Sequence, residues 1–150
     1  MDVQEHTKPE NMLRYSFLWN EARLVIAAIS LLWGATPVLS RFMSSSGYGI
    51  YVICSVISGV VGVYLLYLWN KAGRKLFGGN DRKDLIAFMI ATLSGVHLGL
   101  GGLLGTNIAM SIIGYSGLLF TLAVIVTGLL YLWSAWHLWQ QYKTHGEKLF

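Results

Sequence analysis

The chain has 150 residues, of which 55% are hydrophobic and only 12% are charged, and its formal net charge is +4. Soluble globular domains carry about 25% charged residues, so this composition excludes an ordinary soluble domain and predicts a small integral membrane protein. The single cysteine, Cys54, excludes an intrachain disulfide and a paired-cysteine redox or zinc site.

The first segment, residues 1–22, is polar, and we expect a cytoplasmic tail. Charged residues are spread along the segment and leave no uninterrupted apolar centre, so the sequence contains no cleavable secretory signal there. Apolar residues at helical spacing (Met12, Tyr15, Leu18 and Trp19) leave two interpretations open. The segment forms either a short helix on the membrane surface or a plain lead-in to the first span.

Residues 23–139 contain four apolar stretches. A helix needs about 20 apolar residues to cross the hydrocarbon core of a bilayer, so the sequence predicts an all-α bundle of four transmembrane helices. The predicted spans are 24–42, 48–69, 85–105 and 118–139. A hydrophilic loop, 70–84, separates the second span from the third, and either Asp81 or Asp84 is expected to cap the third helix. Residues 106–116 form an outer loop, or else the third span continues to about residue 113.

The basic residues favour one orientation. With four spans, the N-terminal segment to Arg23, the 70–84 loop and the C-terminal tail 140–150 share a side. They hold ten of the eleven Lys and Arg, and only Arg41 lies opposite. The positive-inside rule then predicts that both termini are cytoplasmic, and a bacterial or archaeal plasma membrane is the simplest location. We therefore interpret the positive charge as a determinant of membrane topology, and we expect no nucleic-acid partner. An attraction of the 70–84 loop to anionic lipids stays open.

An internal repeat is a further possibility. Ile26–Ser30 resembles Ile90–Ser94, and Tyr67–Trp69 repeats as Tyr131–Trp133 at the same offset. The chain is therefore either two tandem, parallel helical hairpins or a chance match between apolar segments.

Small residues at four-residue spacing mark faces where two membrane helices can approach closely. We expect the second and third spans to make the closest contact. Gly101 and Gly105 lie on a different face of the third span and are predicted to contact another subunit. The predicted helix-packing residues are Ser55, Ser58, Gly59, Gly62, Gly95, Gly99, Gly101 and Gly105.

His97 is the one titratable side chain deep within a predicted span, and such residues are functional hypotheses by default. It could bind a haem, a pigment or a quinone, or donate one hydrogen bond across the bundle. His137 lies some 15 Å from it along the helix axes, so the two cannot sandwich one haem. No Asp or Glu lies within a span, and Glu21 lies only at the start of the first. This argues against a proton or cation pump.

Three functions follow from these patterns. The leading hypothesis is a non-catalytic structural or accessory membrane subunit that packs through its third span in a homo-oligomer or larger complex. The alternative is a pigment-, haem- or quinone-binding subunit of an electron-transfer complex, with His97 as ligand. The third is a small transporter or channel. No phosphate loop, nucleophile elbow, paired-carboxylate site or His/Cys metal cluster is present in the sequence, so we expect no enzyme.

Overall fold

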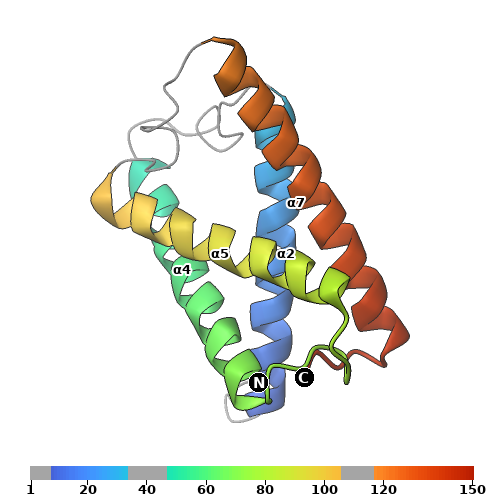
Figure 1. The fold of residues 1–150 in the computed structure, drawn as a ribbon. Coiled ribbons are helices and arrows are strands. Elements are labelled where there is room, and N and C mark those ends of the chain that lie inside the picture. Colours follow the sequence, from blue (N-terminus) through green and yellow to red (C-terminus); the bar gives the residue numbers. More distant parts are fainter. Residues whose placement is uncertain (1–7, 34–46, 106–116) are drawn as a thin grey trace.

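A computed structural model describes residues 8–33, 47–105 and 117–150. Within these ranges the chain forms four α-helices and no strand. They are α2 (Pro9–Leu32), α4 (Gly47–Lys71), α5 (Arg82–Leu104) and α7 (Leu118–Thr144) (Figure 1). Three of them, α4 from Gly49 onward, α5 and α7, are long and apolar enough to cross a membrane. The predicted all-helical fold is thus confirmed for the described residues.

The first helix differs from its predicted form. α2 starts with Pro9, which suits a first turn because its missing N–H needs no partner there. It continues without a break to Leu32, so the mixed segment 12–22 and the first part of the predicted span 24–42 are one helix. The rest of that span, like the segment 106–116, lies outside the described residues.

The helices associate as two pairs. α4 packs mainly on α5, α2 packs mainly on α7, and contacts between α5 and α7 join the pairs (Figure 1). The start of α2 and the end of α7 lie at the same end of the molecule, where Arg14 and Glu147 form an ion pair of 3.3 Å. Arg14 and the hydrogen-bonded Lys143 hold the pKa of the Glu147 carboxyl below its usual range, with the Lys143 hydrogen bond as the main cause.

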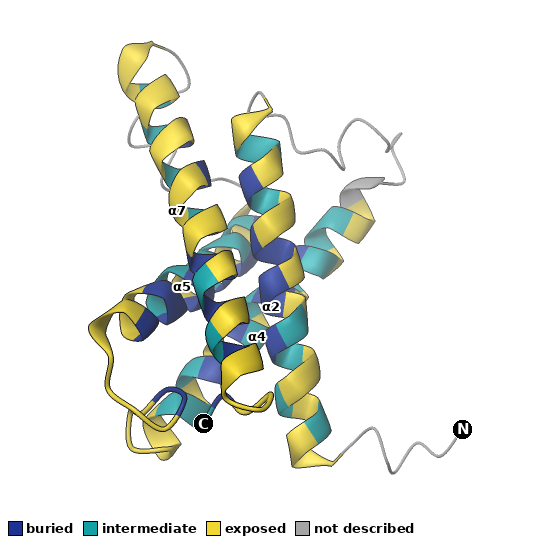
Figure 2. Ribbon diagram, turned by 90° about the vertical axis from the view of Figure 1, so that its right-hand side faces the viewer, coloured by how far each residue is buried: buried dark blue, intermediate teal, exposed yellow. Residues whose placement is uncertain are grey.

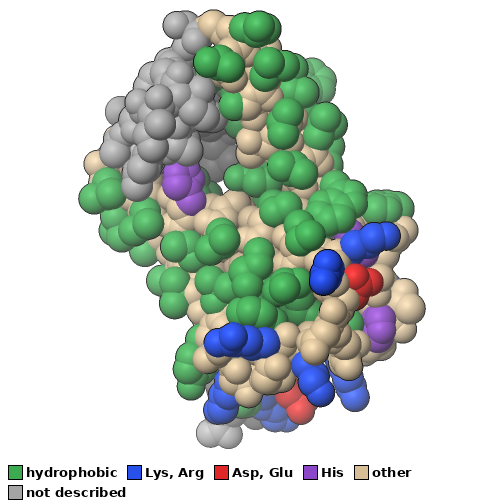
Figure 3. Space-filling view, viewed as in Figure 1, with side chains coloured by type: hydrophobic (Ala, Val, Ile, Leu, Met, Phe, Trp, Pro, Cys, Tyr) green, Lys and Arg blue, Asp and Glu red, His purple; other side chains and the backbone are tan. Residues whose placement is uncertain are grey.

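The aromatic and aliphatic core is concentrated at this end of the molecule. Phe17, Phe88 and Leu138 are buried there, together with Leu149 from the C-terminal tail. The tail is held by a backbone hydrogen bond from Phe77 to the Leu149 carbonyl, 2.9 Å long. Elsewhere the outer sides of the helices are apolar and exposed (Figures 2 and 3), which is typical of a surface covered by lipid or by other membrane helices.

Glycines bring α4 and α5 into backbone contact. A Cβ atom added at Gly99 would lie 2.6 Å from the Gly59 Cα atom, and one added at Gly62 would lie 2.7 Å from the Thr92 carbonyl oxygen. Gly102 lies against Ser55 in the same way, at 2.6 Å from its Cβ atom. Since real Cβ atoms are not found at such distances, a side chain at these positions would push the helices apart.

The other predicted packing glycines lie elsewhere. Gly101 is half-buried on α5. Gly105 follows the helix as its C-cap in the left-handed conformation, with a φ of 67°, which by itself favours glycine at this position. Contact of Gly101 and Gly105 with another subunit stays a prediction.

Candidate functional site

A cluster of buried polar side chains occupies the middle of α2. Asn20, Glu21 and Arg23 are only 1%, 6% and 9% exposed. The Arg23 Nη2 atom donates to the Asn20 side-chain oxygen at 2.9 Å and to the Ala91 carbonyl oxygen of α5 at 2.7 Å. Arg23 therefore ties α2 to the backbone of α5.

Ser94 and Gly95 of α5 complete the surroundings of the guanidinium. The same Nη2 atom donates to the Ser94 hydroxyl at 3.0 Å. A Cβ atom added at Gly95 would lie 3.4 Å from Nη2 and 2.9 Å from the Ser58 carbonyl oxygen. The missing side chain at Gly95 thus lets α4 approach α5, while the guanidinium lies at an ordinary contact distance from this position.

Tyr131 of α7 extends this arrangement, because it lies close to both Arg23 and Ser94. We call Asn20, Arg23, Ser94 and Tyr131 the central polar network. Tyr131 is the middle residue of α7, and Ser94 is one residue past the middle of α5. The network therefore lies at the centre of two helices that are long and apolar enough to cross a membrane.

Glu21 differs from its neighbours because both of its carboxylate oxygens are buried and lack a hydrogen-bond partner among the described residues. It shares a buried face of α2 with Phe17, Leu24 and Ala28, at the four- and three-residue spacing of one helix side. A carboxylate in such a place has no donor among the described residues to stabilise its charge.

The register between α2 and α7 locates the surroundings of Glu21. The rings of Phe17 and Tyr142 are 4.4 Å apart, and Leu32 lies against Gly128. The two helices are thus antiparallel, and this register sets Glu21 level with Leu138 of α7. The Ser134 hydroxyl is also buried without a hydrogen-bond partner among the described residues.

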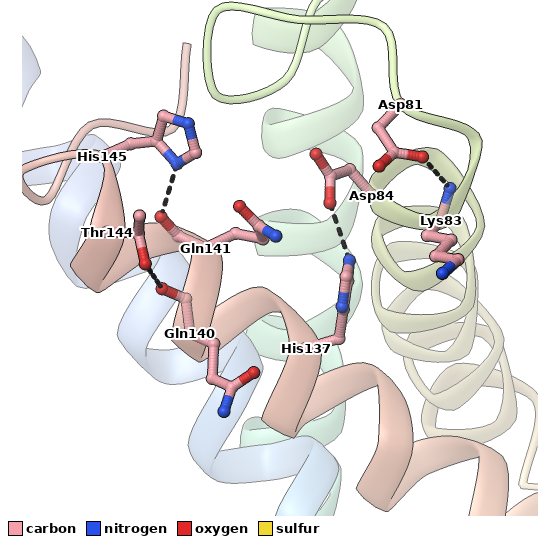
Figure 4. Close-up of polar contacts among 8 residues, drawn as sticks. All are labelled: Asp81, Lys83, Asp84, His137, Gln140, Gln141, Thr144 and His145. Carbon is pink, nitrogen blue, oxygen red and sulfur yellow. Dashed lines mark hydrogen bonds and ion pairs between the residues drawn. The ribbon is translucent and has the colours of Figure 1, made fainter.

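A second polar pair lies at the start of α5. His137 Nε2 and an Asp84 carboxylate oxygen are 2.7 Å apart, pointing toward each other from α7 and α5 (Figure 4). The Trp133 ring stacks on the imidazole at 5.6 Å between centroids. Asp81 is the N-cap of α5 and accepts from the backbone N–H of Lys83 (Figure 4). Asp84 is thus free of the capping role and is available to His137.

The structure keeps His97 and His137 apart. His137 binds Asp84, which lies thirteen residues before the half-buried His97 on α5. At 1.5 Å per residue this is about 20 Å along the helix. In the described part of the chain no group of three or more His, Cys, Asp or Glu could hold a metal ion.

Hydropathy does not reveal the buried carboxylates. The expectation that no Asp or Glu lies within the apolar bundle is wrong, because Glu21 and Asp84 are 6% and 5% exposed. In the sequence, Arg23 served only as a topology signal. The spacing of Glu21 with the apolar Phe17, Leu24 and Ala28 was the available signal, since it puts the carboxyl on the apolar face of the helix.

No known protein family, curated protein sequence or solved structure matches the chain.

Proposed function

We propose that the protein is a small membrane transporter that binds and releases protons at Glu21. The observation that carries this proposal is the burial of both Glu21 carboxylate oxygens without a hydrogen-bond partner among the described residues. An ionised carboxylate in an apolar interior is so unfavourable that the group binds a proton instead. Ionisable residues inside membrane proteins commonly mark proton or ion paths.

Arg23 allows Glu21 to release its proton. A site that only stabilised the neutral acid would never release its proton, so a transport site must also tolerate the carboxylate. The guanidinium of Arg23, two residues away and buried, offers a positive charge that stabilises the ionised form. Tyr131 of α7 lies near Arg23. Burial favours the protonated form of Glu21 and the charge of Arg23 favours the ionised form, so both protonation states of Glu21 are accessible.

The proposal includes four membrane spans, with α2 as the first. Support comes from α2 packing lengthwise on α7, which is itself apolar enough to cross a membrane. The outer side of α2 exposes Val25, Ile26 and Ile29, 37% to 48% of each, as expected beside lipid. Its buried charges face the other helices. The Arg14–Glu147 ion pair joins the two ends of the chain, which favours both termini on one side, the cytoplasmic side by the positive-inside rule.

A proton-flux measurement tests the function. We would reconstitute the purified protein into liposomes containing a pH-sensitive dye and impose a potential that drives protons inward. The wild-type protein should acidify the lumen faster than protein-free liposomes, and Glu21→Gln should remove this flux. Glu10→Gln, at an exposed position of the same helix, should keep it. Equal flux in the wild-type and Glu21→Gln proteins would refute the proposal.

Packing of α5 on another subunit is a second proposal. The α4–α5 contact uses Gly99 and Gly102, and the neighbouring Gly101 is half-buried on the same helix. Binding of a haem, pigment or quinone at His97 stays a prediction, and the absorbance spectrum of the purified protein tests it.

A further inference from the structure

The segment 71–83, which connects α4 to α5, carries a group of basic side chains on the molecular surface. All of them are exposed, and within the described ranges none forms an ion pair. Figure 3 shows Lys and Arg side chains gathered at this end of the molecule, below an apolar region. We call the segment the basic loop, and its basic residues are Lys71, Arg74, Lys75, Arg82 and Lys83.

The basic loop has a defined shape, because its apolar residues are anchored. Leu76 and Phe77 are only 3% and 7% exposed. The backbones of Leu76 and Gly79 exchange two hydrogen bonds, of 3.1 and 2.8 Å, and both residues between them have positive φ, as in a type I′ turn. The Phe77 N–H donates to the Leu149 carbonyl oxygen, and its ring stacks on His145. The apolar side chains of the turn are thus buried, and the basic side chains before and after it stay outside.

The acidic groups at this end of the molecule already have partners. Asp81 accepts a hydrogen bond from a backbone N–H as the N-cap of α5. Asp84 binds His137. Glu147 pairs with one basic side chain of α2 and one of α7. These carboxylates therefore leave the positive charge of the basic loop without a counter-charge among the described residues.

The basic loop lies where a membrane would have its headgroup layer. Lys71 is the last residue of one helix that is long and apolar enough to cross a bilayer, and Arg82 is the first residue of the next. Basic side chains at such positions lie close to the lipid phosphates. Each of them contributes about 1 kcal/mol near an anionic surface, or roughly fivefold in affinity.

Exposed tryptophans of α7 lie at the same level. Trp133 and Trp136 are 40% and 64% exposed. They lie within one turn of His137, which contacts Asp84 in the first turn of α5. Tryptophan is enriched where a membrane protein meets the headgroup layer. Aromatic and basic side chains thus occur together at the start of α5.

We propose that the basic loop binds the headgroups of anionic phospholipids. The proposal does not depend on proton transport. The lipid phosphate oxygens accept hydrogen bonds from the Lys and Arg side chains of the loop. The acyl chains lie along the exposed apolar sides of α4 and α5 (Figure 2). A soluble phosphate has no such chains, so it binds more weakly than the lipid.

Thermal unfolding of the whole chain in detergent with added lipid tests the proposal. Phosphatidylglycerol should raise the unfolding midpoint, because a ligand that binds only the folded state stabilises it, and phosphatidylcholine should not. Lys75→Gln/Lys83→Gln should need about tenfold more phosphatidylglycerol, or still more, for the same rise. The cap of α5 stays intact in this variant, because Asp81 bonds the backbone of Lys83 and not its side chain.

Lys8→Gln/Arg14→Gln is the matched control, since it removes two exposed basic side chains at the start of α2. It should respond to phosphatidylglycerol as the wild type does. Binding at the basic loop is contradicted by an equal rise with both lipids, by an undiminished response of the loop variant, or by an equal loss in the control.

Two further measurements complete the test. Glycerol phosphate, a headgroup without acyl chains, should leave the midpoint unchanged, and a rise equal to that with the lipid would overturn the assignment to a lipid. If the loop variant fails to fold, salt decides the matter in the wild type. About 0.5 M sodium chloride screens exposed charges and should remove the response to phosphatidylglycerol. A response that survives this salt would refute the proposal.

Discussion

Arg23 of α2 donates a 2.7 Å hydrogen bond to the backbone carbonyl of Ala91 in α5, 68 residues further along the chain. Gly95 lies beside this contact, at an ordinary distance of 3.4 Å from the guanidinium for an added Cβ atom. The bond joins the α2–α7 pair to the α4–α5 pair, and it holds a buried charge against the backbone of α5. The association of the two helix pairs is therefore tied to this charge.

The first prediction concerns this contact. Arg23→Leu leaves the Asn20 and Ser94 side chains without their partner, so we expect a loss of about 1–3 kcal/mol in the free energy of unfolding. Unfolding of the detergent-solubilised protein by heat or denaturant measures it. Arg14→Leu, which breaks only the exposed ion pair with Glu147, should change stability by at most about 1 kcal/mol. Equal effects of the two substitutions would show that the buried network contributes nothing.

The second prediction concerns the contact of α4 with α5. In Gly99→Ala the added methyl group would lie 2.6 Å from the Gly59 Cα atom, so the two backbones must separate. Overpacking of this kind costs about 1–3 kcal/mol, and a lower midpoint of thermal unfolding should report it. The matched control is Gly49→Ala in α4, where nothing lies within 4 Å of the new atom. A Gly99→Ala protein as stable as the wild type would contradict the close approach.

The third prediction concerns assembly. Gly101→Leu places a large side chain on the half-buried side of α5, and we expect it to reduce the assembly size in mild detergent, as measured by light scattering. Gly105 is a poor site for the same change, because its φ of 67° would be strained by leucine. Gly49→Leu, at an exposed glycine of α4 where nothing lies within 4 Å of a new Cβ atom, is the control and should leave the assembly intact. An unchanged size in Gly101→Leu would rule out packing through this face.

The fourth prediction concerns the C-terminal tail. Leu149 is 1% exposed and belongs to the core at the end of the bundle. Leu149→Ala should therefore lower the free energy of unfolding by about 2–5 kcal/mol, the range for truncation of a buried leucine. Lys148→Ala removes a neighbouring exposed side chain and should be nearly neutral. Similar thermal stability of the two variants would show that the tail is not part of the folded core.

Sequence alone determined the helical class and most helix limits. The predicted spans 48–69, 85–105 and 118–139 differ by only a few residues from α4, α5 and α7, because a helix hidden from water must be apolar over the width of a bilayer. The predicted start of the first span at residue 24 followed the charges at Glu21 and Arg23. Hydropathy treats such charges as a boundary, whereas the backbone of α2 remains helical through them.

Only the tertiary structure decided which charges are buried. Asp84 and His137 are 53 residues apart in the chain, and Glu21 is hidden because α7 packs antiparallel to α2. Burial depends on which other helix covers a side chain, and a single helix does not specify its partner. The central polar network and the unpartnered Glu21 carboxyl therefore emerge from the association of helices that are each defined by local hydrophobicity.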